Sequence, residues 1–179
     1  MSDLVVFTYK HEDKASEVLQ EITRLKQENV QKPLIGIEDA AVAVKRDDGK
    51  VKVRQTLETA ALGSSVASGG LWGLLIGFLF GGPLLGALAG AAISGILGRK
   101  IDIGINNEFI KDVSEELAPG DSALFLLVKD TPVDTLVDTL NAQGGRLYHT
   151  SLSEDAAAAF TQASGHEDVR RALELEESL

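Results

Sequence analysis

The chain has 179 residues, a length that fits one ordinary domain with an elaboration, and it contains no cysteine. Disulfides, thiolate nucleophiles and zinc sites built on sulfur are therefore excluded. The formal net charge of −10 and the aromatic content of 5% both argue against nucleic acid as a partner.

The first 58 residues predict a strand, a helix and a β-hairpin. Residues 4–9 form a short apolar run that is typical of a buried strand, and apolar residues at helical spacing over 15–25 predict a helix. Strands are predicted over 41–44 and 51–54, on either side of Asp48-Gly49, a pair that strongly favours a tight hairpin turn. Valine alternates with lysine and arginine in the second of these strands, so we expect one of its faces to lie in solvent.

An uncharged segment follows this hairpin. Residues 59–98 contain no charged side chain and 11 of the 18 glycines of the chain. Small residues recur there at every fourth position, in two runs that are one residue out of phase. The first run is Ser65, Gly69, Gly73, Gly77 and Gly81, and the second is Gly82, Gly86, Gly90, Ser94 and Gly98. Because proline cannot continue a helix, Gly81-Gly82-Pro83 predicts a turn between two helices, over 62–80 and 84–97. We call this segment, 59–98, the insert.

The composition of the insert points to lipid. Small residues at every fourth position let helix backbones approach closely within a membrane. In water, each interior glycine costs a helix about 1 kcal/mol relative to alanine. A long uncharged apolar segment is typical of a membrane span, so we expect the lipid bilayer and further copies of this chain as partners. A soluble homo-oligomer that buries the hairpin between its subunits remains the alternative.

Basic residues on both sides of the insert predict its orientation. The two flanking segments join one folded domain, so both ends of the insert must lie on the same side of a membrane. Lys50, Lys52 and Arg54 precede it, and Arg99 and Lys100 follow it. The positive-inside rule then places the domain and both termini in the cytoplasm. The two helices would reach roughly 28 and 21 Å, against about 30 Å of hydrocarbon, so both a spanning and a re-entrant hairpin remain open.

The chain beyond the insert predicts further alternation of helices and strands. Apolar residues at every fourth position over 105–117 predict an amphipathic helix that ends at Pro119-Gly120. The later elements are a buried strand over 123–128, a helix over 133–140 and an edge strand over 146–151.

The element order predicts the fold class. Without the insert, the first six elements match the β-α-β-β-α-β order of the ferredoxin-like fold, with one more helix and strand appended. We therefore expect an α+β, ferredoxin-like antiparallel sheet that is formed by residues 1–58 and 99–163 and interrupted by the insert. An acidic C-terminal helix is expected over 164–179.

Catalytic and ligand-binding motifs are absent from the sequence. There is no phosphate-binding loop, no nucleophile elbow and no histidine pair with metal-ligand spacing. We expect His149 to be a solvent-side or hydrogen-bonded residue of its strand rather than a base. Asp134 and Asp138 lie one helical turn apart and are expected to form a solvated helix face. We therefore expect no enzyme activity, no cofactor and no metal site.

One stretch of sequence carries a family resemblance. Leu117-Ala118-Pro119-Gly120-Asp121-Ser122-Ala123-Leu124-Phe125, together with the insert and Thr150-Ser151-Leu152-Ser153, resembles the prokaryotic domain-of-unknown-function 1269 family. The resemblance covers nearly the whole chain, and its Pro-Gly-x-Ser-Ala-Leu-Phe part is the most specific. It implies a membrane-associated protein with a ferredoxin-like domain around an apolar insert. It implies no catalytic residues and no substrate.

These patterns predict a non-enzymatic, self-associating membrane protein with a scaffolding or membrane-remodelling role. Two other classes of function stay open. One is a regulatory or small-ligand-sensing domain that is tethered to the membrane. The other is a pore, although Ser64, Ser65, Ser68 and Ser94 are the main polar side chains of the insert.

Overall fold

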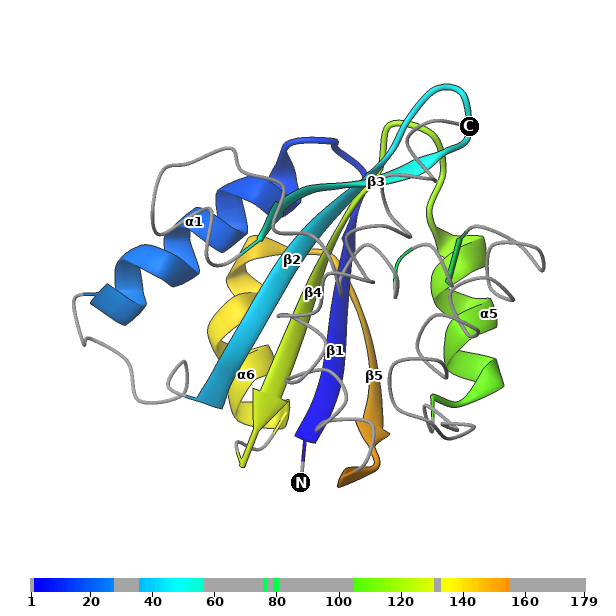
Figure 1. The fold of residues 1–179 in the computed structure, drawn as a ribbon. Helices are drawn as coiled ribbons and strands as arrows, with labels where there is room; N and C mark the ends of the chain where they lie inside the picture. Colours follow the sequence, from blue (N-terminus) through cyan, green and yellow to red (C-terminus); the bar gives the residue numbers. More distant parts are fainter. Residues whose placement is uncertain are drawn as a thin grey trace, which may run out of the picture.

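The computed structural model describes residues 2–27, 36–56, 76, 79–80, 105–130 and 133–154. These residues form an α+β fold in which helices lie on both faces of a five-stranded antiparallel sheet (Figure 1). The strands are β1 (Ser2–Tyr9), β2 (Ile37–Lys45), β3 (Val51–Thr56), β4 (Ser122–Lys129) and β5 (Arg146–Leu152). The helices are α1 (Lys14–Gln27), α5 (Asn107–Glu116) and α6 (Val133–Leu140), which a short 3-10 helix, Asn141–Gln143, extends.

Hydrophobic patterning explains the strand order, which is β3-β2-β4-β1-β5. Strands β1 and β4 are almost continuously apolar and are buried on both faces, so they occupy the centre of the sheet. In β3 the valines are half-buried and Lys52 and Arg54 are exposed, as their alternation predicts. The expected edge position of the strand at 146–151 is also confirmed.

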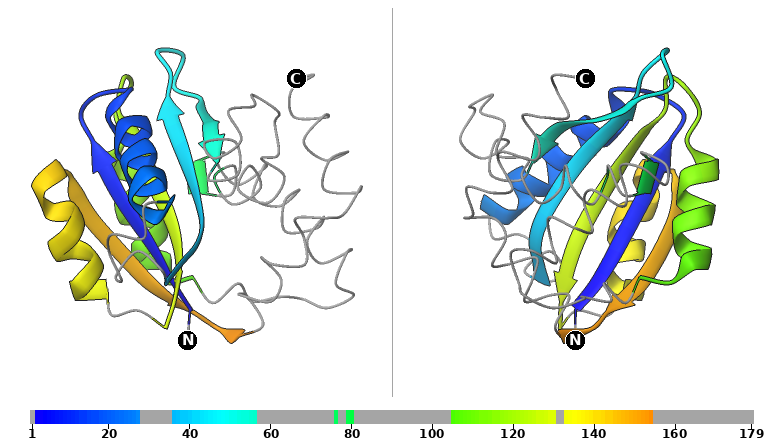
Figure 2. Two further views of the ribbon diagram at one scale, coloured as in Figure 1. Left: turned by 90° about the vertical axis from the view of Figure 1, so that its left-hand side faces the viewer. Right: turned by 45° about the vertical axis from the view of Figure 1, so that its right-hand side comes forward.

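Two crossover connections place their helices on the same face of the sheet. From β1 the chain runs through α1 to β2, and β4 lies between these two strands; from β4 it runs through α6 to β5, and β1 lies between them. The side chains of α1 and α6 share one apolar cluster with the sheet. Helix α5 belongs to a second cluster and lies on the opposite face (Figure 2).

The predicted assignment of elements to the six-element β-α-β-β-α-β pattern is wrong for two strands and two helices. The sequence pattern includes β3 and α5 among its six elements and leaves α6 and β5 as additions. In the structure β3 is an edge strand and α5 lies opposite α1, whereas α6 and β5 complete the second crossover. The charged residues of β3 account for the difference, because they could not be buried at the centre of the sheet.

The predicted turn at Asp48-Gly49 agrees with the structure, and the boundary of strand β2 differs from the prediction. Gly49 adopts a φ of +82°, and its N–H donates to the carbonyl of Arg46 at 2.9 Å, which closes the expected hairpin. Strand β2 begins at Ile37, four residues before the expected start, because Ile37 pairs with Val128 of β4. Glu38 is exposed and lies at a register shift, so the apolar pattern is interrupted there and the predicted strand begins too late.

Most of the predicted helical hairpin lies outside the described residues, as do Gly81-Gly82-Pro83 and the helix expected over 164–179. Ile76, Leu79 and Phe80 are described, and all three are helical. Within the described ranges, no helix combines the length and apolar character that crossing a membrane requires.

Candidate functional site

The predicted packing residues of the insert cannot be placed. Ser65, Gly69, Gly73, Gly77, Gly81, Gly82, Gly86, Gly90, Ser94 and Gly98 all lie outside the described residues, and so do Arg99 and Lys100. Lys50, Lys52 and Arg54 are described.

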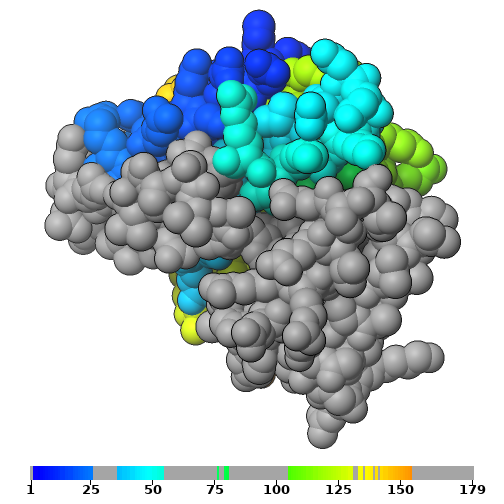
Figure 3. All heavy atoms as spheres, turned by 45° about the horizontal axis from the view of Figure 1, so that its top comes forward, coloured from blue at the N-terminus to red at the C-terminus, as the bar shows by residue number. Residues whose placement is uncertain are grey.

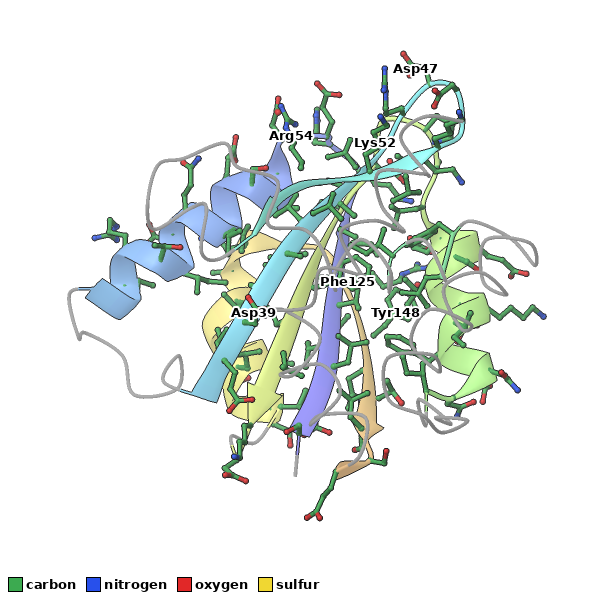
Figure 4. The ribbon with its side chains drawn as sticks, viewed as in Figure 1. Asp39, Asp47, Lys52, Arg54, Phe125 and Tyr148 are labelled. Atoms are coloured by element: carbon green, nitrogen blue, oxygen red, sulfur yellow. The ribbon has the colours of Figure 1, made fainter. Side chains whose placement is uncertain are left out.

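The three described basic residues are exposed. Lys50 lies in the β2–β3 turn, and Lys52 and Arg54 lie on β3, which forms part of the surface in Figure 3. Lys52 and Arg54 extend away from the sheet in Figure 4. The guanidinium of Arg54 lies 2.7 Å from the carboxylate of Asp13, which immediately precedes α1. It also donates to the carbonyl of Glu12 at 3.3 Å. Arg54 therefore connects the β3 edge to the start of α1.

The described part of the insert packs on the sheet. Ile76 and Leu79 are 1% and 4% exposed and belong to the same apolar cluster as Phe125 of β4. Phe80 is partly buried and packs against that cluster. Side chains of an uncharged segment thus complete the core of the domain on the face opposite α1 and α6.

Three fully buried alanines characterise the sheet in this cluster. Ala43 of β2 lies directly opposite Ala123 of β4, and Ala41 lies opposite Phe125. On the other side of β2, Ala43 lies opposite Val53 of β3. Because alanine ends at Cβ, this part of the sheet leaves room for larger side chains above it. We call Ala41, Ala43, Ala123 and Phe125 the alanine face.

Sequence reasoning recognised these strands but missed the alanine face. The signal was present in Ala41-Val42-Ala43-Val44, because alternation within a strand places both alanines on one side and both valines on the other. Val42 and Val44 do pack on the α1 side.

Helix α5 covers another part of the same cluster. Phe109 and Val113 are the buried residues of the helix, and the C-cap residue Leu117 is buried as well. All three belong with Leu152 of β5 to the cluster that contains the alanine face. Figure 4 shows Tyr148 on the side of the sheet that faces α5. The helix begins at a conventional N-cap, where Asn106 Oδ1 accepts from the N–H of Glu108 at 2.9 Å.

A charged network holds the C-terminal end of α5. Lys10 Nζ lies 3.2 Å from a carboxylate oxygen of Glu116 and 3.0 Å from Asp121. Arg146 lies 2.9 Å from the other carboxylate oxygen of Glu116. Lys45 Nζ donates to the carbonyl of Leu117 at 2.9 Å. Helix α5 has no basic residue in its last turn, so lysines from β2 and from just after β1 supply the positive charge that a helix C-terminus favours.

The pKa values within this network shift in the directions that ion pairing predicts. Hydrogen bonds to Asp121 and then to Glu116 raise the pKa of Lys10. Partial burial alone would raise the pKa of Glu116, but the hydrogen bond from Lys10 and the charges of Lys10 and Arg146 outweigh it and lower that pKa. The network therefore favours the charged forms of Lys10 and Glu116.

The stretch that carries the family resemblance builds the neighbouring turn. Asp121 closes it, because its carboxylate accepts from the N–H of Ala118 at 2.9 Å and its own N–H donates to the Ala118 carbonyl at 2.9 Å. Gly120 adopts a φ of +88°, which favours glycine. Ser122 Oγ accepts from the N–H of Ala15 at 3.2 Å and donates to the carbonyl of His11. These side chains join the end of α5 to the start of α1, and this is a structural role.

The residues weighed for catalysis lie where the sequence predicts. His149 is exposed on β5, and Asp134 and Asp138 are exposed on α6. Among the described residues, no group of three histidine, aspartate or glutamate side chains could hold a metal ion. The alanine face shares one apolar cluster with Ile76 and Leu79 of the insert, and we take this apolar surface as the candidate functional site.

Comparison with known proteins gives one match. The model of a family described as "Protein of unknown function (DUF1269)" matches residues 66–164, which is more than half of the chain. No curated protein and no solved structure matches.

Proposed function

The chain belongs to the DUF1269 family, and we propose that it is a non-enzymatic, self-associating membrane protein with a scaffolding or membrane-remodelling role. Its insert would embed in lipid and pack against the inserts of neighbouring copies. The basic residues on both flanks support a cytoplasmic domain with both termini on the same side of the membrane.

One observation carries this proposal. The 40 residues of the insert contain no charged side chain, and small residues recur in them at every fourth position. Such a segment favours hydrocarbon, and its small residues allow close helix approach where lipid removes the hydrophobic drive for association.

A second candidate has support of its own, which is the burial of Ile76 and Leu79 in the core of the domain. If the rest of the insert also packs on protein, the molecule is a soluble assembly that buries the hairpin between subunits. In that case the glycines would serve protein–protein packing alone.

Vesicle flotation distinguishes the two candidates. The full chain, purified without detergent, is mixed with vesicles of phosphatidylcholine and phosphatidylglycerol and centrifuged through a density gradient. We expect the protein to float with the vesicles and to resist extraction by high salt, because the contact with lipid is apolar. A monodisperse, lipid-free protein that stays at the bottom of the gradient would contradict membrane association.

We further propose that β1, α1, β2, β4, α6 and β5 form a ferredoxin-like unit. The two crossovers, each enclosing one antiparallel strand, and the shared helical layer support this assignment. In this view β3, the insert and α5 are an elaboration between the second and third strands of the unit.

A further inference from the structure

We infer that the outer edge of β5 is an interface between two copies of this chain, in which the two β5 strands pair antiparallel about a twofold axis. Strand β5 is at one end of the strand order, and among the described strands it pairs with β1 alone (Figure 1). An edge strand presents unpaired backbone N–H and C=O groups, which another strand can satisfy. This interface is separate from the proposed packing between inserts and does not rest on it.

The two edges of the sheet differ in how well they are protected from other chains. Strand β3, at the other edge, carries the exposed cations Lys52 and Arg54, and its pairing with β2 shifts register between Val42 and Ala43. Outward charges and register irregularities keep edge strands from pairing with other chains. Strand β5 pairs with β1 without a register shift, and Arg146, at its first position, is its only formally charged residue. The unprotected edge therefore favours a partner strand.

The domain itself holds β5 in the geometry that pairing requires. Leu147 packs against the cluster that contains α1 and α6, and Tyr148 packs against the cluster that contains α5, so apolar contacts hold both faces of the strand. His149 and Ser151 are exposed. The strand contains neither proline nor glycine, so each of its residues has an N–H for pairing and none weakens the strand. A strand that is ordered beforehand loses little conformational freedom when it binds.

The sequence of β5 fits a second copy of itself. An antiparallel register centred on His149 lets all seven residues of the strand pair, whereas a displaced centre leaves residues at the strand ends unpaired. Leu147 then lies opposite Ser151 of the second copy. Arg146 lies opposite Leu152 of the second copy, so no like charges meet. The twofold axis makes each of these contacts occur twice, which favours a closed dimer.

The test uses single cysteines, because the chain contains none of its own. His149→Cys is compared in the full chain with Ser151→Cys on the same strand and with Lys52→Cys on β3; all three positions are exposed. In the proposed register, two cysteines at position 149 lie directly opposite each other, with Cβ atoms about 4.5–5.5 Å apart, which is close to the geometry of a disulfide. Two cysteines at position 151 lie about 13 Å apart, because each is two residues from the axis at about 3.3 Å per residue. Each variant is oxidised and separated by electrophoresis without reductant.

We expect the disulfide-linked dimer of H149C to exceed that of S151C and that of K52C at least about fivefold, because only position 149 meets its own copy. Reduction should return the dimer to monomer. Equal cross-linking of all three variants would indicate collision without a fixed register and would overturn the inference. A monomeric H149C would overturn it as well, because the edge would then be free or covered by another segment of the same chain.

Charge exchange at the same position gives a second measurement that needs no oxidation. His149→Lys and His149→Asp each place a charge at the axis, so two copies of one variant oppose like charges and a mixed pair opposes unlike charges. Tagged and untagged full-length chains are mixed, and the untagged chain that copurifies is measured. We expect recovery from the mixed pair to exceed that from both like pairs severalfold. Equal recovery from all three combinations would overturn the β5 interface without bearing on association through the insert.

Discussion

Ala43 and Ala123 lie directly opposite each other on β2 and β4, and both are fully buried in the cluster that contains Ile76 and Leu79. Two neighbouring strands therefore present their smallest side chains where an uncharged helical segment contributes large ones. This complementarity makes the described part of the insert a component of the domain's core. It also makes the stability of the domain sensitive to residues of the insert.

The first prediction concerns that sensitivity. Leu79→Ala and Ile76→Ala should each lower the free energy of unfolding by about 2–5 kcal/mol, because each leaves a cavity in a packed core. Urea unfolding followed by circular dichroism measures the loss. Phe80→Ala, at a partly buried position, should cost less. A change below about 0.5 kcal/mol for both core variants would show that the insert does not contribute to the stability of the domain.

A second prediction concerns the small residues of the insert. Gly73→Leu and Gly90→Leu should change the oligomer size on light scattering while leaving vesicle binding intact, because they block close helix approach and add apolar surface. Ala89→Leu, one position away from the period of Gly90, is the matched control and should leave assembly unchanged. If assembly is indifferent to both glycine substitutions, the small-residue face is not the packing surface.

Ser122 is the subject of the third prediction. Ser122→Ala leaves the buried N–H of Ala15 without its acceptor, so it should cost about 1–3 kcal/mol of stability. Ser114 donates to the carbonyl of Lys111 in an exposed hydrogen bond within α5, and it offers a control at which alanine should change stability little. Equal costs in chemical denaturation would contradict a specific role of Ser122 in joining β4 to α1.

Local patterns predicted most elements of the fold but not their arrangement. The apolar runs of β1 and β4, the Asp48-Gly49 hairpin and the helix at 133–140 are each encoded within a few residues. Strand order depends on which strands can be buried on both faces. Lys52 and Arg54 alternate with valine in β3, which indicates a strand with one solvent-exposed face. Such a strand is favoured at the edge of a sheet, where β3 lies.

The candidate site was harder to predict, because its two parts are far apart in the sequence. Hydropathy described Ile76 and Leu79 correctly as apolar, but a helix that is apolar on all sides fits lipid and a protein core equally well. The small side chains of the alanines at 41, 43 and 123 mark the part of the sheet on which such large apolar side chains can pack. The Asp121 and Ser122 contacts also join distant segments, so the motif predicted a family but not its structural role.

The fourth prediction concerns acid stability. The pKa of Glu116 is lowered from its ordinary value of 4.5, so its ion pairs contribute stability above that pH and lose it as the pH falls through the shifted value. Glu116→Gln should therefore be less stable than the parent at neutral pH, and the difference should shrink as the pH falls below 4.5. Urea midpoints measured across acid pH test this. A constant difference in stability between E116Q and the parent across this pH range would contradict the ion-pair account.

The last prediction concerns Tyr9, whose side chain is 4% exposed and whose hydroxyl has no hydrogen-bond partner among the described residues. Burial raises the pKa of this phenol well above its ordinary value of 10.0. The unfolded chain therefore ionises first as the pH rises past 10, and the folded state loses stability there, by up to about 1.4 kcal/mol per pH unit from this group. Tyr9→Phe removes an unpaired buried hydroxyl, so near neutral pH it should be neutral or stabilising by about 1 kcal/mol or less. Its advantage over the parent should grow above pH 10, as unfolding midpoints at increasing alkaline pH would show. Parallel stability curves for the two proteins across that range would mean that the phenol ionises as readily in the folded state as in the unfolded one.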